Sequence, residues 1–394
     1  MTGSRRPLAG ALTMVVPLHI AINGIRPMTS YKALGLGATV EQLGLLSIGF
    51  AGLALLTAIP LGRAIDRWGA RPFTVAAPAL VAAAALGLVL TDSLVVVILL
   101  QSAIGLGLVA AAIGYQTLVA AAGPLESADR RFGSLTAVVA LSQLAGPAVA
   151  GVIAETAAAA GATPADDPHG VTWVFAVMCG LATASAIVAF TLPDPGAPAR
   201  PGARSGIGAD TVQVLRTPGI AGALVVSVVV FGVTDLLILY LPVFGTQAGW
   251  SVGFVAALLA TRAGASVAIR LVFGRLIERL GRRVLLAAGC VLGILSAVAL
   301  PLAGDTVGPF VCLAIFGAAV GMGQPISMAW VARFAPAHLR STSLGVRLTV
   351  NQVWLIAVPP VVGVIIGLAG PAWLFFSIAG LLAATLPPIA RGPR

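Results

Sequence analysis

Long apolar runs broken by short polar segments are the dominant pattern of this chain. A bilayer core about 30 Å thick is crossed by roughly 20 apolar residues in a helix, which satisfies its own backbone hydrogen bonds in lipid. The pattern therefore predicts an all-α membrane protein with twelve spans. The expected spans are 8–27, 42–61, 73–91, 94–117, 133–155, 172–192, 219–241, 252–273, 284–303, 308–330, 345–368 and 372–390.

The second half of the chain repeats the first at a spacing of 212 residues, which falls to 200 near the end of each half. Matching pairs are Gly105 and Gly317, Pro147 and Pro359, Gly151 and Gly363, and, at the shorter spacing, Trp173 and Trp373. Two six-helix halves of equal orientation are therefore expected at 1–192 and 218–394. The Pro-rich segment between them, 193–217, predicts a flexible cytoplasmic linker.

Composition and charge agree with a membrane protein. The chain is 59% hydrophobic and 9% charged, far from the averages of soluble domains. The net charge of +10 does not indicate nucleic-acid binding, because most of the 23 Lys and Arg residues fall at the termini and in alternate loops. Arg26, Lys32 and Arg262 are among those that do not. This asymmetry predicts that both termini are cytoplasmic. The many Arg, Ala and Gly residues are typical of a GC-rich bacterial genome.

Two charged segments lie between expected spans at equivalent places of the repeat. They contain Gly62, Arg63, Asp66, Arg67, Gly69 and Arg71 in the first copy, and Gly274, Arg275, Glu278, Arg279, Gly281 and Arg283 in the second. Each combines glycines that permit close helix approach, an acid suited to a facing helix N-terminus, and arginines suited to an anionic membrane surface.

This pattern resembles the loop between helices 2 and 3 of the major facilitator superfamily, and the first copy departs from it only at Ala70. The resemblance implies a transporter fold of twelve helices in two pseudo-symmetric halves. It also implies transport by alternating access and a gating role for the two charged segments. Helices 1, 4, 7 and 10 would line a central cavity.

Polar side chains inside the expected spans are the candidates for a substrate or proton cavity, since such groups are costly in hydrocarbon. His19, Asn23 and Arg26 share one helix face. Asp235 is the only carboxylate well inside a span and occupies the repeat position of Asn23. The full set is His19, Asn23, Arg26, Gln101, Tyr115, Gln143, Asp235, Arg262, Gln324, Asn351 and Trp354.

Each candidate also has a structural interpretation. His19 could hydrogen-bond a neighbouring carbonyl, and Asp235 and Arg262 could form a permanent ion pair. Tyr115 and the glutamines could join neighbouring helices, and Trp354 could be a packing residue.

The span at 133–155 contains Gly146, Pro147 and Gly151, which are similar to the helix 5 motif of drug–proton antiporters in this superfamily. The proline would bend the helix and the glycines would allow tight packing. Gln101 stands where proton-coupled members often carry Arg, so the resemblance does not extend to that residue.

These patterns predict a secondary transporter in the bacterial cytoplasmic membrane. The sequence contains no nucleotide-binding loop, metal cluster or nucleophile–base set, so it predicts no enzyme activity, cofactor or nucleic-acid partner. The first hypothesis is proton-coupled efflux of a small amphipathic compound by a monomer, favoured by the helix 5 motif and Asp235. The second is uptake or exchange of a small organic anion, because His19, Arg26 and Arg262 outnumber Asp235. The third is a transporter-like receptor or scaffold without transport.

Overall fold

The computed structural model describes residues 5–121, 128–161, 170–191, 207–217, 219–304, 306–323 and 340–391. Regular structure in these ranges is entirely helical, without a strand. One predicted cavity residue, Gln324, lies outside the described residues, as does the first part of the expected linker.

The helices follow the order predicted from the apolar runs. The earlier ones are α1 (Arg5–Gly35), α2 (Val40–Trp68), α3 (Arg71–Leu90), α4 (Leu94–Ala121), α5 (Ala128–Ala159) and α6 (Val171–Thr191). The later ones are α7 (Ile207–Arg216), α8 (Ile220–Gln247), α9 (Val252–Leu280), α10 (Arg282–Ala299), the 3-10 helix η2 (Leu300–Leu302), α11 (Gly308–Gly321), α13 (Arg340–Ala369), α14 (Trp373–Ala383) and α15 (Leu386–Arg391).

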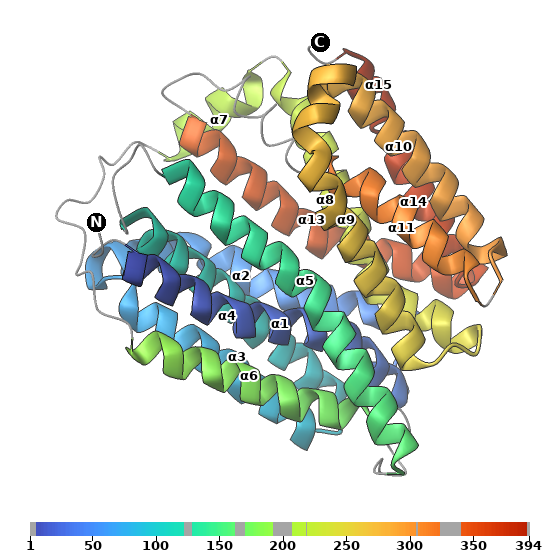
Figure 1. Cartoon of the computed structure of the whole chain (residues 1–394), viewed down its shortest axis with the longest axis horizontal. Helices are drawn as coiled ribbons and strands as arrows, with labels where there is room; N and C mark the ends of the chain where they lie inside the picture. Colours follow the sequence, from blue (N-terminus) through green and yellow to red (C-terminus); the bar gives the residue numbers. More distant parts are fainter. Residues whose placement is uncertain are drawn as a thin grey trace. The chain divides into compact units, whose positions relative to one another are not determined.

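The chain forms two compact units (Figure 1). Unit 1 comprises Met1–Gly202 with Ser251–Ala257, and unit 2 comprises Ala203–Trp250 with Leu258–Arg394. The division after Gly202 falls inside the segment expected to be a linker. The first turns of α9 belong to unit 1 and the rest of this helix belongs to unit 2.

Part of the expected flexible linker is helical, which corrects the prediction for that part. The helix is α7, whose ten residues contain no proline. It buries Val214 completely and contacts α8 and α13 of unit 2. The prolines that dominate the linker's composition all precede this helix.

Ten helices in the described part of the chain are long and apolar enough to cross a membrane. The first expected span lies in α1, which has 31 residues, while α11 has 14 residues and ends before the undescribed range 324–339. Twelve spans therefore stay a prediction, and a multi-pass membrane protein is well supported.

The repeat is visible in the helix ends. α2 and α9 begin and end at positions 212 residues apart. Each is followed by a glycine with a positive φ, 85° at Gly69 and 76° at Gly281. Such a backbone conformation favours glycine because a side chain would be strained there. These two glycines therefore end their helices, and each charged segment is mostly the last turns of a helix rather than an open hairpin.

Each unit packs its helices in the same pattern. In unit 1, α1 contacts α5, and α3 contacts α4 and α6; in unit 2, α8 contacts α13, and α10 contacts α11 and α14. A β-carbon at Gly105 of α4 would collide with the backbone oxygen of Phe50 in α2. A β-carbon at Gly317 of α11 would collide with the backbone oxygen of Arg262 in α9 in the same way. Both contacts join residues that correspond at the 212-residue spacing.

At a second pair of equivalent helix contacts, the glycine lies on a different helix in each unit. Gly107 of α4 lies against the backbone oxygen of Ala77 in α3, at 3.1 Å from an added β-carbon. In unit 2 the glycine is Gly289 of α10, which faces the backbone oxygen of Ala319 in α11 at 2.8 Å. The repeat thus preserves close backbone packing, while either helix can supply the glycine.

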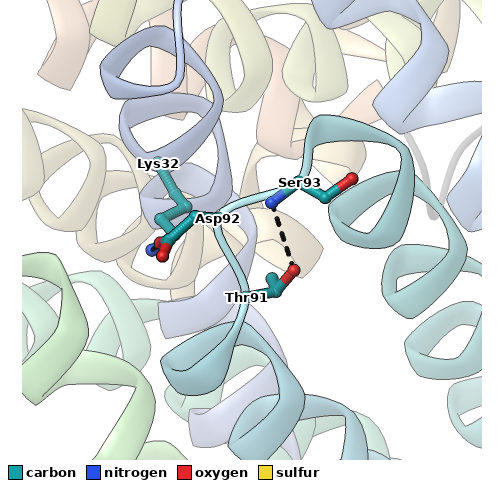
Figure 2. A network of polar contacts seen from close by, with 4 residues as sticks. All are labelled: Lys32, Thr91, Asp92 and Ser93. Atoms are coloured by element: carbon teal, nitrogen blue, oxygen red, sulfur yellow. Dashed lines mark hydrogen bonds and ion pairs between the residues drawn. The ribbon is translucent and has the colours of Figure 1, made fainter.

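Two helix ends differ from the expected spans. α1 continues through Pro27 to Gly35, because proline does not prevent a longer helix with a local bend. This extension carries Lys32 to the turn between α3 and α4, where its ammonium lies 3.3 Å from a carboxylate oxygen of Asp92 (Figure 2). The last expected span is interrupted between α14 and α15, just before Pro387, which has no amide hydrogen to donate.

Candidate functional site

The polar interior of unit 1 centres on a contact between α1 and α4. His19 and Tyr115 are both buried, and the ring nitrogen Nε2 of His19 lies 3.1 Å from the Tyr115 hydroxyl. The two rings meet edge to face with centroids 5.8 Å apart. The hydrogen-bond partner of His19 is therefore a side chain on another helix. The structural interpretation from the sequence had expected a neighbouring backbone carbonyl instead.

The other two residues of the predicted α1 face behave differently. The Asn23 amide donates to the His19 backbone oxygen at 2.7 Å, within its own helix. The Arg26 guanidinium lies over the Phe50 ring of α2, 4.3 Å from the centroid. A planar cation over an aromatic face is an attractive arrangement that leaves the guanidinium edge for other contacts.

Gln101 of α4 joins α1 further along the helix. Its amide nitrogen donates to the hydroxyl of Thr29, which is fully buried. The amide oxygen of Gln101 is buried and has no hydrogen-bond partner among the described residues. The structural interpretation of Gln101 as a helix–helix contact thus accounts for one end of its amide only.

Unit 2 buries charged residues inside its apolar helices. Asp235 on α8 is 3% exposed and Arg262 on α9 is 8% exposed. The permanent pair of Asp235 and Arg262 considered from the sequence stays a prediction. The Nε nitrogen of Arg262 has no hydrogen-bond partner among the described residues.

A third buried charge in unit 2, Arg347 on α13, was not among the candidates from the sequence. It is 5% exposed, and its Nε donates to the hydroxyl of Ser227 on α8 at 2.5 Å. Its burial could not be predicted from its position near the start of an apolar run, because the end of a span can be placed from sequence only to within a few residues. The small polar partners Thr29 and Ser227 were also missed, since such residues are common in membrane helices.

The predicted residues Asn351 and Trp354 lie one and two turns beyond Arg347 on α13. Asn351 is buried, and the Trp354 indole lies so close to α8 that a β-carbon at Gly232 would overlap it. The Asn351 oxygen Oδ1 and the Trp354 nitrogen Nε1 are buried without hydrogen-bond partners among the described residues. Trp354 is therefore a packing residue that also carries an unused donor.

The helix 5 motif lies on α5 at two close helix contacts. A β-carbon at Gly146 would lie 2.7 Å from the Asn23 β-carbon and 2.9 Å from the Ile20 oxygen, both on α1. Gly151 faces Ala256 within unit 1, at 2.5 Å from an added β-carbon. Pro147 is buried inside the helix, whereas Gln143 is exposed. The glycines thus have the packing function that their size predicted.

The charged segments are only partly described. The side chains of Arg63, Asp66 and Arg275, and the surroundings of Gly274, lie outside the described part of the chain. A β-carbon at Gly62 would meet no described atom within 4 Å, so its predicted close helix contact stays a prediction.

The arginines of these segments lie at the helix ends. Arg71 begins α3 and donates from Nη2 to the Phe190 backbone oxygen of α6 at 3.0 Å. Arg67 lies over the ring of Trp68 at 5.8 Å from the centroid. Glu278 and Arg279 are exposed at the end of α9, and Arg283 is half-buried at the start of α10. A gating role for these residues stays a prediction.

Among the residues that the structure describes, no group of three or more His, Cys, Asp or Glu side chains could hold a metal ion.

Comparison with known proteins identifies the fold. The family model described as Major Facilitator Superfamily matches residues 11–359. A mutant of the nucleoside transporter NupG is similar with a TM-score of 0.80 and 14% identity, over 98% of this chain and 99% of that one. A bacterial homologue of the human lysosomal transporter Spinster, inward-facing and occupied, has a TM-score of 0.78 and 15% identity, over 99% and 97% of the two chains. No curated protein sequence matches this chain. The predicted all-α transporter fold is confirmed.

Proposed function

Because the chain belongs to the Major Facilitator Superfamily, we propose that it is a secondary transporter of small organic anions that works by alternating access in the bacterial cytoplasmic membrane. Membership makes it a multi-pass membrane transporter of small molecules and not an enzyme. The preference for anions is the second hypothesis drawn from the sequence, and the buried charges favour it over the first.

The observation that carries this proposal is an excess of buried positive charge. Arg262 and Arg347 are each less than 9% exposed, and Asp235 is the only acid buried to that degree among the described residues. Charges inside membrane helices are costly and are kept where they serve a substrate or ion pathway. A buried arginine without a described carboxylate partner is suited to an anionic substrate group, which it can bind with two parallel hydrogen bonds.

Proton-coupled export of an amphipathic compound is the second candidate. Its support is the buried carboxylate of Asp235, which could carry the proton, together with the close packing of α5 at Gly146 and Gly151. Proton coupling through Asp235 is proposed for either class of substrate, and the direction of transport and a monomeric state are proposals as well. Both termini are proposed to be cytoplasmic on the basis of the loop charges.

Replacing Arg262 separates a functional charge from a structural one. In proteoliposomes, Arg262→Gln is expected to lower the uptake efficiency for carboxylate and phosphate-ester probes about 100-fold, or roughly 2.7 kcal/mol, because the anion loses its buried cation. Arg262→Lys should retain part of the rate. The melting temperature of Arg262→Gln should not fall, since the substitution removes a buried charge that has no described ion-pair partner.

The matched control is Arg216→Gln, which removes an exposed arginine from α7. Its uptake of the same probes should equal that of the unmodified protein. Unchanged anion uptake by folded Arg262→Gln protein would contradict the proposal, and so would a large loss of melting temperature with normal uptake.

A further inference from the structure

The interface between α8 and α13 in unit 2 carries a row of buried and half-buried polar side chains. Arg347, Asn351 and Trp354 are spaced by four and three residues, so they share one face of α13. The row extends about 6 Å along the helix axis from Arg347 to Asn351 and about 10 Å from Arg347 to Trp354. Ser227 and Gly232 of α8 contact the two ends of this row.

Two atoms in the row are left without hydrogen-bond partners in the described part of the chain. They are an acceptor, Oδ1 of Asn351, and a donor, Nε1 of Trp354. Leaving a buried polar group unsatisfied is costly, so native proteins seldom keep two such atoms on one helix face without a reason. If these side chains only joined the helices, polar groups of α8 would be expected to bond them.

The contact with Gly232 fixes the indole of Trp354. Any side chain at this position of α8 would occupy the space that the ring now fills. The indole nitrogen is therefore held against α8 at Gly232, and Trp354 follows Asn351 by about one turn on the same face of α13. A donor beside an acceptor complements a ligand group that has both functions, such as a hydroxyl or a carboxamide.

The other end of the row carries a positive charge. The Nε of Arg347 bonds the neutral hydroxyl of Ser227, and no carboxylate among the described residues forms an ion pair with Arg347. This serine orients the guanidinium without neutralising it. The two ends of one helix face thus provide a cation and a neutral hydrogen-bonding pair.

We propose that Arg347, Asn351 and Trp354 form a substrate subsite that selects organic anions bearing a hydroxyl or carboxamide about 6–10 Å from the acid group. Arg347 binds the acid, and Asn351 and Trp354 bind the neutral polar group. This inference rests on the proposed transport of organic anions and adds the second group that the substrate must carry.

The test uses matched pairs of anions that differ by one hydroxyl. The probes are benzoate with 4-hydroxybenzoate, phenylacetate with 4-hydroxyphenylacetate, and hexanoate with 6-hydroxyhexanoate, each titrated into the purified full-length protein by calorimetry. The unmodified protein should bind the hydroxylated member of at least one pair about tenfold more tightly, the effect of one good hydrogen-bonding site.

The variants assign the two ends of the subsite. Asn351→Leu and Trp354→Phe should each remove the preference for the hydroxylated member while keeping the affinity for the plain acid. Arg347→Gln should weaken both members of a pair equally, by about tenfold or more. Trp373→Phe, which alters an exposed tryptophan on α14, should change neither quantity.

Three results would overturn the inference. They are equal binding of both members of every pair by the unmodified protein, a hydroxyl preference that persists in both Asn351→Leu and Trp354→Phe, and unchanged binding by Arg347→Gln. Failure to bind any of the six anions would instead contradict the proposed function itself.

Discussion

Asp235→Asn is expected to abolish transport driven by a pH gradient while leaving substrate exchange intact. Asp235 is the only acid buried below 9% exposure in the described part of the chain, and it lies inside α8. Buried carboxylates of membrane helices commonly carry protons, because they can lose their charge by binding one. Asparagine keeps the shape and the hydrogen-bonding capacity of the side chain but can neither bind nor release a proton.

The measurement is accumulation of a radiolabelled organic anion in proteoliposomes with and without an imposed pH gradient. With one proton per substrate, a gradient of one pH unit supports about tenfold accumulation. In Asp235→Asn the concentration of the labelled anion should become equal on the two sides of the membrane, whereas Asp235→Glu should keep part of the accumulation. Asp92→Asn, which changes an exposed acid in the turn after α3, is the control expected to behave normally.

Two outcomes would remove Asp235 from the coupling mechanism. Accumulation that persists in Asp235→Asn would show that another group carries the proton. Loss of exchange together with loss of folded protein would make Asp235 a structural residue.

The second large effect is expected at the repeated glycine contacts. Gly105→Ala and Gly317→Ala should each lower the melting temperature by roughly 5–10 °C, because the added methyl would overlap a backbone oxygen of the neighbouring helix, at a cost of about 1–3 kcal/mol. A backbone oxygen cannot be moved by a change of rotamer, so the helices must separate.

Gly180→Ala and Gly380→Ala are the matched controls, since a β-carbon at either position meets nothing within 4 Å. These two substitutions should leave the melting temperature unchanged or raise it, because alanine favours the helix by about 0.5–1 kcal/mol relative to glycine. Fluorescence-detected size-exclusion after heating would measure all four variants. Equal behaviour of the two sets would contradict the packing described for Gly105 and Gly317.

The sequence predicted those features that depend on periodicity and local geometry. The apolar runs located the helices, and the repeat placed Gly69 and Gly281 where positive φ angles end α2 and α9. The linker was predicted less well, because prolines dominate its composition. Helix α7, which follows these prolines in the sequence, depends on contacts with α8 and α13 that no local pattern reveals.

The candidate site was predicted by residue type but not by contact. His19 and Tyr115 were both candidates, yet only the packing of α1 against α4 joins them. Arg347 was missed because its burial depends on Ser227 and α8, while its sequence position resembles a charge at a loop boundary. Burial of a polar residue near a span's end is set by the neighbouring helix, and a single sequence does not name that neighbour.

The most direct test of organic-anion transport is counterflow in proteoliposomes made from the unmodified protein. Vesicles are loaded with an excess of one unlabelled compound and diluted into a trace of the same labelled compound, so that no ion gradient is needed. The account predicts transient accumulation of labelled organic anions, reduced about 100-fold in initial rate by Arg262→Gln. Counterflow of organic cations or neutral amphipathic compounds, with none for any anion, would contradict it.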